Sequence, residues 1–410
     1  MKKQLRLLVA GEAVFAVKGE HEPVGGIKFV FSHLKFVLGL LFLFSLIQSF
    51  AASPKDESAH SQILDWTDIR TLEVEGRGWN DTKEFYDRLP AKAEKLVSAP
   101  VWGLSHDSAG ILVRFQTDAT EISARWAVAS TNLAMPEMSA NGASGLDLYV
   151  KDNKHWRWLG VGKASRLTNT CELIGKMIPG EREYLLYLPL FNHTKFVELG
   201  VPTNYIIRKA SAWGDGVRKP IVFYGTSILQ GLGAERPGIV HSAILGRRFN
   251  WPTINLGFSG CGRMEPVMAD LLAELDPSVY VLDCLPNMNS AQVTERVEPF
   301  VQKLLAAHPQ TPIVLVEDRV YANAYLSSWR PGFHADNHAA LRTAFEHLHK
   351  GGIKNLYYLP ADRLFGDDGE WTVDGSHPNA LGFMRQADAF ANVLEPLLQT
   401  QIHKLTSNEN

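Results

Sequence analysis

Residues 220–231 read PIVFYGTSILQG, an apolar run that passes directly into Gly225, Thr226 and Ser227. The run predicts a buried strand, and the glycine predicts the turn that ends it. A serine on a turn between a buried strand and the next helix presents its hydroxyl at the rim of the sheet, close to free N–H groups of the helix N-terminus. Ser227 is therefore a candidate nucleophile. Alternatively it only caps the helix, which is the commonest role of serine at a helix start.

The same alternation continues through the second half of the chain. Further apolar runs lie at 251–257, 278–284, 312–318 and 355–360, and helical stretches lie at 238–249, 265–274, 290–307, 333–350 and 379–400. Near-continuous apolar strands separated by helices are typical of a parallel sheet covered on both faces. Residues 218–400 are therefore predicted to form a three-layer α/β domain. Ligands of such sheets bind beyond the carboxyl ends of the strands, so the residues after each run are candidate site residues.

Chemically useful residues follow these runs. Gly257 ends the second run and can point its N–H into a site, or it can simply serve a tight turn. Asn287 follows the third run, where its amide can donate to an oxyanion or belong to an ordinary turn. Asp374 and His377 lie three residues apart before the last helix, so a carboxylate can orient an imidazole base. A turn cap and a surface histidine are the alternative for this pair.

Residues 60–205 have a different pattern, with short β-like runs between polar turns. Examples are 110–118, 121–128, 146–152, 156–162 and 183–190. Short strands without a long helical period predict an antiparallel, jelly-roll-like β-sandwich. The chain is thus expected to hold an all-β domain at 60–205 and an α/β domain at 218–400.

Composition excludes some classes of function. The 410 residues include 41 Lys plus Arg and 44 Asp plus Glu, and the net charge of −3 gives no electrostatic attraction for nucleic acid. Three cysteines, Cys171, Cys261 and Cys284, cannot all pair and are too far apart for a Cys-x-x-Cys site. Buried thiols are expected, with a Cys261–Cys284 bridge as the alternative. We expect no cofactor, and the sequence does not determine the oligomeric state.

The N-terminal segment, residues 1–52, has the order of a secretory signal. Early basic residues precede an uncharged run at 36–47 and small residues up to Ala51 and Ala52. This order predicts cleavage near Ala51 or Ala52 and a periplasmic or extracellular protein. The run is shorter than the roughly 20 residues that cross a bilayer, so a membrane anchor through an uncleaved signal is the alternative.

Three weaker signals remain. His334 and His338 are spaced for one helix face, but no HExxH glutamate accompanies them, so we expect a solvated helix face and no metal site. Arg236, in the loop after the nucleophile turn, is a candidate substrate contact. The fourth run ends in Glu317, Asp318 and Arg319, which either line the substrate cleft or form an internal salt bridge.

Taken in chain order, Ser227, Gly257, Asn287 and the pair Asp374 and His377 resemble the four sequence blocks of the SGNH hydrolase superfamily, the GDSL-type esterases and lipases. The resemblance covers residues 218–400 and implies a flavodoxin-like sheet. It also implies that Ser227 attacks an acyl carbon, that His377 takes its proton, and that Asp374 orients His377. The implied oxyanion donors are the N–H groups of Ser227 and Gly257 and the side-chain amide of Asn287.

A second motif extends the resemblance to about residue 60. GASGLDLYVKD at 142–152 is similar to the Gly-x-Asp-Leu-Tyr signature of a β-sandwich that precedes the catalytic domain in one bacterial branch of these esterases, and YLLYLPLFN at 184–192 fits that branch too. The sequence departs from the common pattern in two places. Thr226 replaces the aspartate of Gly-Asp-Ser, and Asn287 lies in LPNMN where Gly-x-Asn-Asp is usual.

The resemblance and the predicted export imply a secreted serine esterase without a cofactor. Its expected substrate is an O-acyl ester, in particular an O-acetyl ester, on a carbohydrate, either a small molecule or a polysaccharide. One alternative is an O-acyltransferase that uses the same triad with a sugar hydroxyl as acceptor. The other is a non-catalytic carbohydrate-binding protein on the same fold.

Overall fold

The computed structural model describes residues 63–211 and 218–407. The predicted signal segment, residues 1–52, lies outside the described residues. None of the described helices is both long and apolar enough to cross a membrane.

Residues 218–407 build a five-stranded sheet in which all neighbours are parallel and the strand order is β12-β11-β13-β14-β15. The strands are β11 (Ile221–Gly225), β12 (Thr253–Gly257), β13 (Val279–Asp283), β14 (Ile313–Val316) and β15 (Leu356–Leu359). The first strand of this sheet has the second on one side and the third on the other, which is the flavodoxin-like order. The predicted fold class is thereby confirmed, and β11 lies at the topological switch point where ligands bind in such sheets.

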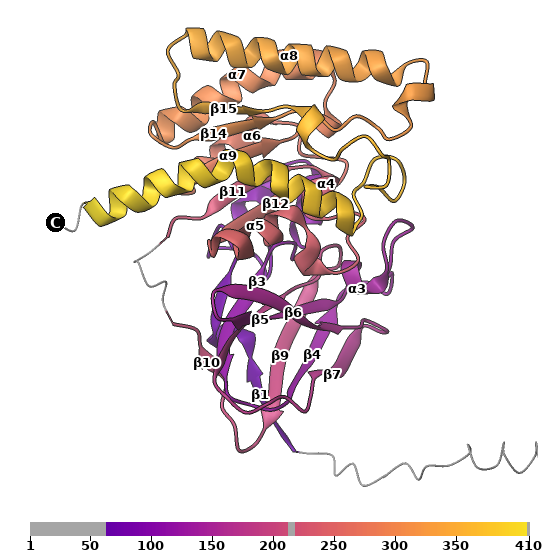
Figure 1. The fold of residues 1–410 in the computed structure, drawn as a ribbon, viewed down its shortest axis with the longest axis vertical. Helices are drawn as coiled ribbons and strands as arrows, with labels where there is room; N and C mark the ends of the chain where they lie inside the picture. Colours follow the sequence, from indigo (N-terminus) through magenta and orange to yellow (C-terminus); the bar gives the residue numbers. More distant parts are fainter. Residues whose placement is uncertain (1–62, 212–217, 408–410) are drawn as a thin grey trace, which may run out of the picture. The chain divides into compact units, whose positions relative to one another are not determined.

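Helices cover both faces of this sheet (Figure 1). They are α4 (Ser227–Gln230), α5 (His241–Phe249), α6 (Pro266–Leu272), α7 (Ser290–Ala307), α8 (Arg330–Lys350) and α9 (Ala380–Ser407). Successive side chains of a strand point to opposite faces. Val222 and Tyr224 of β11 accordingly pack in the core formed with α6, α7 and α8, whereas Ile221 and Phe223 pack in the core formed with α5 and α9. Two buried cores, one on each face, therefore hold β11 rigidly.

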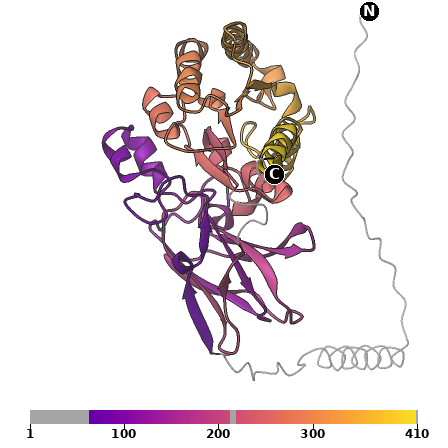
Figure 2. The ribbon, with the colours of Figure 1, turned by 90° about the vertical axis from the view of Figure 1, so that its left-hand side faces the viewer.

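The preceding residues form two antiparallel sheets, drawn in indigo to magenta in Figure 2. One sheet has the order β1-β9-β4-β7, and the other has the order β10-β3-β8-β5-β6 with β2 paired to β3. The strands are β1 (Leu64–Asp68), β2 (Glu73–Glu75), β3 (Leu112–Thr117), β4 (Ile122–Val128), β5 (Leu146–Asp152), β6 (His155–Gly162), β7 (Thr168–Ile174), β8 (Arg182–Tyr187), β9 (Thr194–Pro202) and β10 (Arg208–Lys209). Phe115, Trp126 and Leu148 fill the core between the sheets, so the predicted all-β domain is confirmed.

One segment of the sandwich half packs on the α/β half. Between β2 and β3 the chain leaves the sandwich and forms a 3₁₀ turn at Ala91–Lys95 and helix α2 (Ala99–Ser105). Its apolar side chains, among them Trp79, Leu89 and Val101, belong to the same buried cluster as α6 and α7. The strand patterns that predicted the sandwich did not predict this excursion. A short helix (Ala140–Ala143, α3) also precedes β5.

Candidate active site

Ser227 stands where the opening stretch predicted it, on the turn between β11 and α4. Thr226 takes the N-cap position with extended backbone angles, and Ser227 begins the helix with only 7% of its surface exposed. In the sheet register Gly225 pairs with Gly257 and with Asp283, so the ends of β12 and β13 flank the turn. The serine hydroxyl is therefore held at the carboxyl edge of the sheet.

His377 and Asp374 come from the loop before α9 and complete a hydrogen-bonded chain with Ser227. Ser227 Oγ lies 3.0 Å from His377 Nε2, and His377 Nδ1 lies 2.6 Å from Asp374 Oδ2. The other carboxylate oxygen of Asp374 accepts the backbone N–H groups of Ser376 and His377, both at 2.8 Å. The structure thus brings together all three residues that the sequence predicted as a triad.

The electrostatics of Asp374 favour a fixed imidazole orientation. Burial by itself would raise the pKa of Asp374, but hydrogen bonds from the His377 and Ser376 groups outweigh it and the pKa is lowered. An ionised Asp374 accepts Nδ1–H and leaves the Nε2 lone pair of His377 facing the serine hydroxyl. This arrangement can remove the proton of Ser227 as the oxygen attacks an electrophile.

Arg319, three residues after the end of β14, supports the catalytic loop and forms the internal salt bridge that the sequence left open as an alternative to lining the substrate cleft. It is 5% exposed. Its guanidinium donates to the carbonyl oxygen of Ser376 at 3.4 Å and also to the Ser376 hydroxyl, and it pairs with the buried carboxylate of Asp318. Burial lowers the pKa of Arg319, but the Asp318 charge more than compensates and the net pKa is raised. The Asp318 and Arg319 pair therefore fixes the loop that carries Asp374 and His377.

A second carboxylate lies buried at the end of β13. Asp283 is 3% exposed, and its Oδ2 makes no hydrogen bond within the described residues. Burial, and after it the nearby Asp318 charge, raise the pKa of Asp283 to about 7 against the opposing effect of Arg319. The carboxyl of Asp283 is therefore protonated in a substantial fraction of molecules at neutral pH.

The predicted oxyanion role of Gly257 is wrong. Its N–H donates to Asn255 Oδ1 at 2.9 Å, so that donor is already used. A Cβ at this position would overlap the backbone nitrogen of Gln230 and lie 2.7 Å from the Gln230 Cα. Gly257 is thus needed because α4 packs directly against the end of β12, a role in packing and not in catalysis.

Gly260, three residues after Gly257, has the features expected of a backbone N–H that donates to an oxyanion. It has a left-handed φ of +67° and open space where a Cβ would be, and its N–H makes no hydrogen bond within the part of the chain that the structure describes. The turn around it is fastened on both sides, because Phe258 N–H donates to Gly225 O at 3.0 Å and Ser259 N–H donates to Gln230 Oε1 at 2.9 Å. The turn therefore packs against the end of the nucleophile strand and leaves the Gly260 N–H without a partner among the described residues.

Asn287 ends a short 3₁₀ turn after β13 and contacts the same turn from the other side. Its Nδ2 donates to the carbonyl oxygen of Cys261. A side-chain amide has two N–H donors, so the second remains available for a substrate oxygen. The predicted role of Asn287 as an oxyanion donor is compatible with this geometry and stays a prediction.

Arg236 does not face a substrate, in contrast to the sequence-based hypothesis. Its guanidinium donates at 2.8 Å to Asp147 Oδ2, in the Gly-x-Asp-Leu-Tyr motif of the sandwich, and also to the hydroxyl of Tyr149. Asp147 is fully buried and additionally accepts Gly238 N–H at 2.8 Å and Trp158 Nε1–H at 2.9 Å. The motif therefore works as a clamp: the sandwich holds the loop that follows the nucleophile helix.

Glu317 has an internal role, the second of the two alternatives that the sequence left open. Its oxygens accept Arg342 at 2.7 Å, the Tyr358 hydroxyl at 2.5 Å and the Ala361 N–H at 2.7 Å. Glu317 lies in the wall of a groove of about 840 Å³ beyond the ends of β14 and β15, which Trp371 also lines. Because its oxygens are already engaged, we no longer assign Glu317 as a substrate contact.

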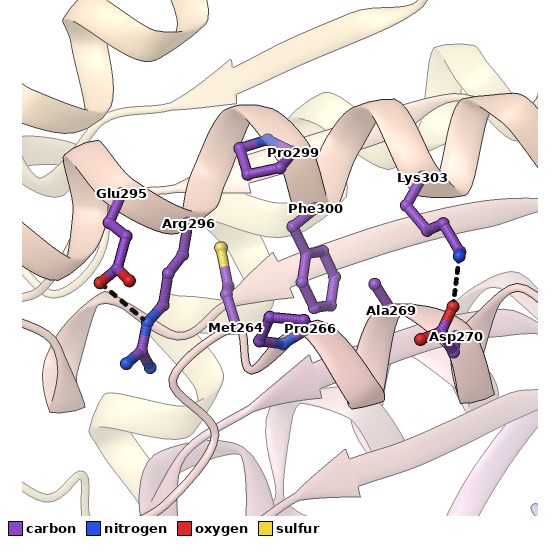
Figure 3. Close-up of a pocket in the computed structure, with 9 residues that line it drawn as sticks. All are labelled: Met264, Pro266, Ala269, Asp270, Glu295, Arg296, Pro299, Phe300 and Lys303. Atoms are coloured by element: carbon purple, nitrogen blue, oxygen red, sulfur yellow. Dashed lines mark ion pairs between the residues drawn. The ribbon is translucent and has the colours of Figure 1, made fainter.

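Another cavity, of about 270 Å³, opens between α6 and α7. Figure 3 shows Met264 and Phe300 beside this space, with the Lys303–Asp270 and Arg296–Glu295 ion pairs at its ends. None of the residues that line it belongs to the triad or to the candidate oxyanion donors. It is therefore distinct from the catalytic constellation.

Other sequence-based expectations have direct outcomes in the structure. All three cysteines are free thiols, so the Cys261–Cys284 alternative is wrong. The Thr226 hydroxyl is buried and makes no hydrogen bond within the described residues, so it replaces no contact that an aspartate would make there. His334 is buried and faces Asp318 at 3.2 Å, and His338 is bonded to the Asp318 carbonyl at 2.9 Å. The expected solvated histidine face is therefore wrong, because these rings pack against the Asp318 region.

Comparison with known proteins agrees with this geometry. Residues 218–395 match the model of the GDSL-like lipase/acylhydrolase family, and residues 64–207 match the N-terminal GxDLY model of SGNH-hydrolase-type esterases. No curated protein matches the chain. Among solved structures, a GDSL-like lipase from Bacteroides ovatus is 34% identical, with a TM-score of 0.78 over 82% of this chain and 98% of that one.

More distant structures share the fold. A salicylyl-acyltransferase of a tetracycline biosynthetic pathway is 19% identical, with a TM-score of 0.66 over 82% of this chain and 97% of that one. A family two carbohydrate esterase from Clostridium thermocellum, solved with cellohexaose, is 15% identical, with a TM-score of 0.53 over 71% of this chain and 93% of that one. With both family models matched and with a 34% identical relative covered almost end to end, the chain belongs to the GDSL-like lipase/acylhydrolase family of SGNH hydrolases, in the branch with an N-terminal GxDLY domain.

Proposed function

We propose that the protein is an exported serine esterase that hydrolyses O-acetyl esters on carbohydrate through an acyl-enzyme. The observation that carries the catalytic part is the hydrogen-bonded chain from Ser227 Oγ through His377 to Asp374, at 3.0 Å and 2.6 Å. Membership of a family of acyl-ester hydrolases supports the same reaction class.

The chemistry follows from the positions of these atoms. Ser227 Oγ forms a bond to the acyl carbon while its proton passes to His377 Nε2, and the carbonyl oxygen becomes an oxyanion. The Ser227 N–H, the Gly260 N–H and the free Nδ2–H of Asn287 stabilise that oxyanion. The C–O bond to the sugar then breaks as His377 returns the proton to the leaving oxygen. Water, deprotonated by the same imidazole, releases acetate from Ser227.

Two observations support a carbohydrate as the alcohol part of the substrate. Fold relatives include carbohydrate esterases, one of them solved with cellohexaose and one an acetyl xylan esterase from Butyrivibrio proteoclasticus. In addition, Tyr325 and Trp329 expose 81% and 60% of their surfaces on the segment after β14. Ala322 N–H of that segment donates to Gly375 O, at 2.9 Å, in the catalytic loop. Exposed aromatic rings beside the site can stack on sugar rings.

The test combines acetate release with active-site variants. Purified protein is assayed on p-nitrophenyl acetate and on acetylated plant and bacterial polysaccharides. We expect Ser227→Ala and His377→Ala to lose roughly 10⁶-fold in turnover, and Asn287→Ala to lose roughly 10²- to 10³-fold. Full activity of Ser227→Ala would refute the mechanism. Activity on p-nitrophenyl acetate without acetate release from any polysaccharide would refute the carbohydrate substrate alone.

Acyl transfer is the second candidate, because the salicylyl-acyltransferase has the same fold over most of this chain. The same acyl-enzyme would then pass its acyl group to an alcohol instead of water. Product analysis with and without acceptor sugars separates the two: a transferase forms acylated acceptor in preference to free acetate. The proposal of export rests on the N-terminal signal pattern, and N-terminal sequencing of secreted protein should place the cut near Ala51 or Ala52.

A further inference from the structure

A group of metal-binding side chains lies apart from the triad, in the sandwich half of the chain. Asp87 and His106 come from the excursion between β2 and β3, and His193 immediately precedes β9. One carboxylate oxygen and one nitrogen from each ring all lie within 4.8 Å of one another. These residues are up to about a hundred positions apart in the sequence, so no short sequence motif indicates a metal site.

The individual distances are close to those of a metal coordination shell. His106 Nδ1 lies 2.9 Å from Asp87 Oδ1, and His193 Nε2 lies 3.8 Å from the same oxygen. Zinc bonds nitrogen and oxygen at about 2.0–2.2 Å, so ligand atoms at the corners of a tetrahedron are about 3.4 Å apart. Shifts of a few tenths of an ångström would bring the Asp87 pairs to that spacing. The two rings stack, 5.2 Å apart between centroids and with 23° between their planes, so one ring must also turn before both nitrogen lone pairs, which lie in the ring planes, meet at one ion.

One of the two histidine nitrogens, His193 Nε2, is not used in a hydrogen bond among the described residues. This nitrogen is buried, and Glu84 Oε2 lies 3.1 Å from it. That carboxylate is within reach as a fourth ligand, but Lys195 Nζ lies 3.0 Å from both of its oxygens. Glu84 therefore either replaces a water in the shell or stays outside it, and the proposal does not depend on which.

A hydrogen bond from the backbone also orients the Asp87 carboxylate, as is usual for metal ligands. Asp87 is fully buried, and its second oxygen accepts the Glu84 N–H at 2.9 Å. That hydrogen bond fixes the carboxylate plane and leaves Oδ1 directed at the two imidazoles. Hydrogen-bonded ligands of this kind are typical of metal shells, in which partners outside the shell hold each ligand in place.

We propose that Asp87, His106 and His193 bind a divalent transition-metal ion, with Zn²⁺ as the matching probe. Two imidazoles and a carboxylate suit zinc and its first-row neighbours rather than magnesium or calcium, which take oxygen ligands. The site would tie the excursion, through Asp87 and His106, to the start of β9, through His193. It would thus be a structural site and would take no part in acyl transfer.

The position of the site gives it a route to the nucleophile. The residue after His106 is Asp107, whose Oδ2 accepts Gln230 Nε2 at 3.0 Å. Gln230 ends the nucleophile helix, and its Oε1 accepts the Ser259 N–H of the turn that carries Gly260. An ion that fixes His106 would therefore also fix the anchor of α4 and of this turn.

Equilibrium dialysis of the full chain against Zn²⁺, with any affinity tag removed, tests the site. We expect about one equivalent bound at micromolar or lower free zinc, and a rise of at least a few degrees in Tm when zinc is added to chelator-treated protein. Co²⁺ in place of zinc should give the visible absorption of a site with few ligands and low symmetry. His193→Ala and His106→Ala should abolish all three effects.

The matched control is His155→Ala, at an exposed position in β6, which should bind zinc like the unaltered chain. Equal binding by His155→Ala and His193→Ala would overturn the proposal, as would zinc uptake only at millimolar concentration. If the histidine variants fail to fold, the cobalt spectrum of the unaltered chain decides, and a spectrum no stronger than the weak visible absorption of hydrated Co²⁺ would overturn the site. Because triad activity is measured separately, a failure here leaves the esterase proposal intact.

Discussion

Removal of the Asp147 carboxylate should destabilise the protein far more than it impairs catalysis. Asp147 is fully buried and accepts three hydrogen bonds, from the Arg236 guanidinium, the Gly238 N–H and the Trp158 indole. The aromatic rings of Tyr149 and Trp158 also lie within 5.5 Å of the Arg236 guanidinium. Asp147 is therefore shielded from water, whereas the Arg236 side chain is 25% exposed. Loss of the Asp147 charge leaves this partly buried guanidinium uncompensated.

The magnitude follows from these contacts. Asp147→Ala removes the two carboxylate oxygens that accept all three hydrogen bonds and leaves Arg236 without its counter-ion, which costs about 3–5 kcal/mol in the free energy of unfolding. In Asp147→Asn the amide oxygen can still face Arg236 and Gly238, but the amide N–H₂ then meets the Trp158 donor. This variant loses the charge and one hydrogen bond, and we expect a cost of about 2–3 kcal/mol. Burial raises the pKa of Asp147 against the opposing effect of Arg236, so a neutral replacement recovers part of the desolvation cost.

Urea unfolding followed by tryptophan fluorescence and by circular dichroism measures the effect, with agreement between the two probes as the check on two-state behaviour. The matched control is Asp152→Asn on the same strand, whose ion pair with Arg157 is 43% and 71% exposed and should contribute less than about 1 kcal/mol. In addition, KM on acetylated substrate should stay unchanged in Asp147→Asn at temperatures below unfolding. A stability change no larger than that of Asp152→Asn would refute the structural role of the Asp147–Arg236 pair. A raised KM would show that Arg236 serves substrate binding.

Three further perturbations test other parts of the site. An unfolded aspartate titrates near 3.9 and folded Asp283 titrates at about 7, so the folded protein holds an extra proton between these values. Asp283 should therefore lower the free energy of unfolding, by up to about 4 kcal/mol, as the pH rises from about 4 to about 7. Burial also raises the pKa of Asp107 to about 6, so urea titrations of Asp283→Asn should show a fall that is smaller than in the unaltered chain but not absent. Arg319→Lys loses the fork that holds Ser376 and should lower kcat roughly 10- to 100-fold with little change in KM; an unaltered kcat would exclude positioning by Arg319. Gly257→Ala should abolish activity and reduce soluble yield, because its Cβ clashes with α4. Gly260→Ala has room for its Cβ and should fold, but it strains the left-handed φ of +67° and should lower kcat by shifting the donor N–H. Activity assays of the two variants at equal folded concentration would show whether these roles are reversed.

The fold and the triad were predictable from the sequence because their signals are local. The apolar run before Gly225 specifies β11, and the nucleophile lies two residues past its end. Asp374 and His377 are three residues apart, so one loop fixes their mutual distance and the sequence spacing alone predicts contact. Their approach to Ser227 then follows from the shared carboxyl edge of the parallel sheet.

The wrong assignments concern groups whose role depends on backbone direction or on distant partners. Gly257 and Gly260 are both glycines of one turn, and only the hydrogen bond from Gly257 to Asn255 reveals which N–H is free. Arg236 is a charged residue in a loop next to the nucleophile, and a residue that contacts substrate would show the same pattern in the sequence. Its partner, Asp147, lies 89 positions earlier, and pairing at such separation is decided by tertiary packing.

The contacts between the two halves imply that the sandwich is part of the catalytic scaffold. Arg88 is fully buried and donates to the carbonyl oxygens of Gly257 at 2.6 Å and of Leu104 at 2.6 Å. It therefore holds the end of β12 from the side of the sandwich half, as Asp107 holds Gln230 and Asp147 holds Arg236. Each of these polar side chains fixes a segment next to Ser227, and none of them touches the triad. An enzyme that stabilises a transition state with fixed dipoles needs such rigidity around the oxyanion donors. The sandwich thus preorganises the turn and the helix around the nucleophile through Arg88, Asp107 and Asp147.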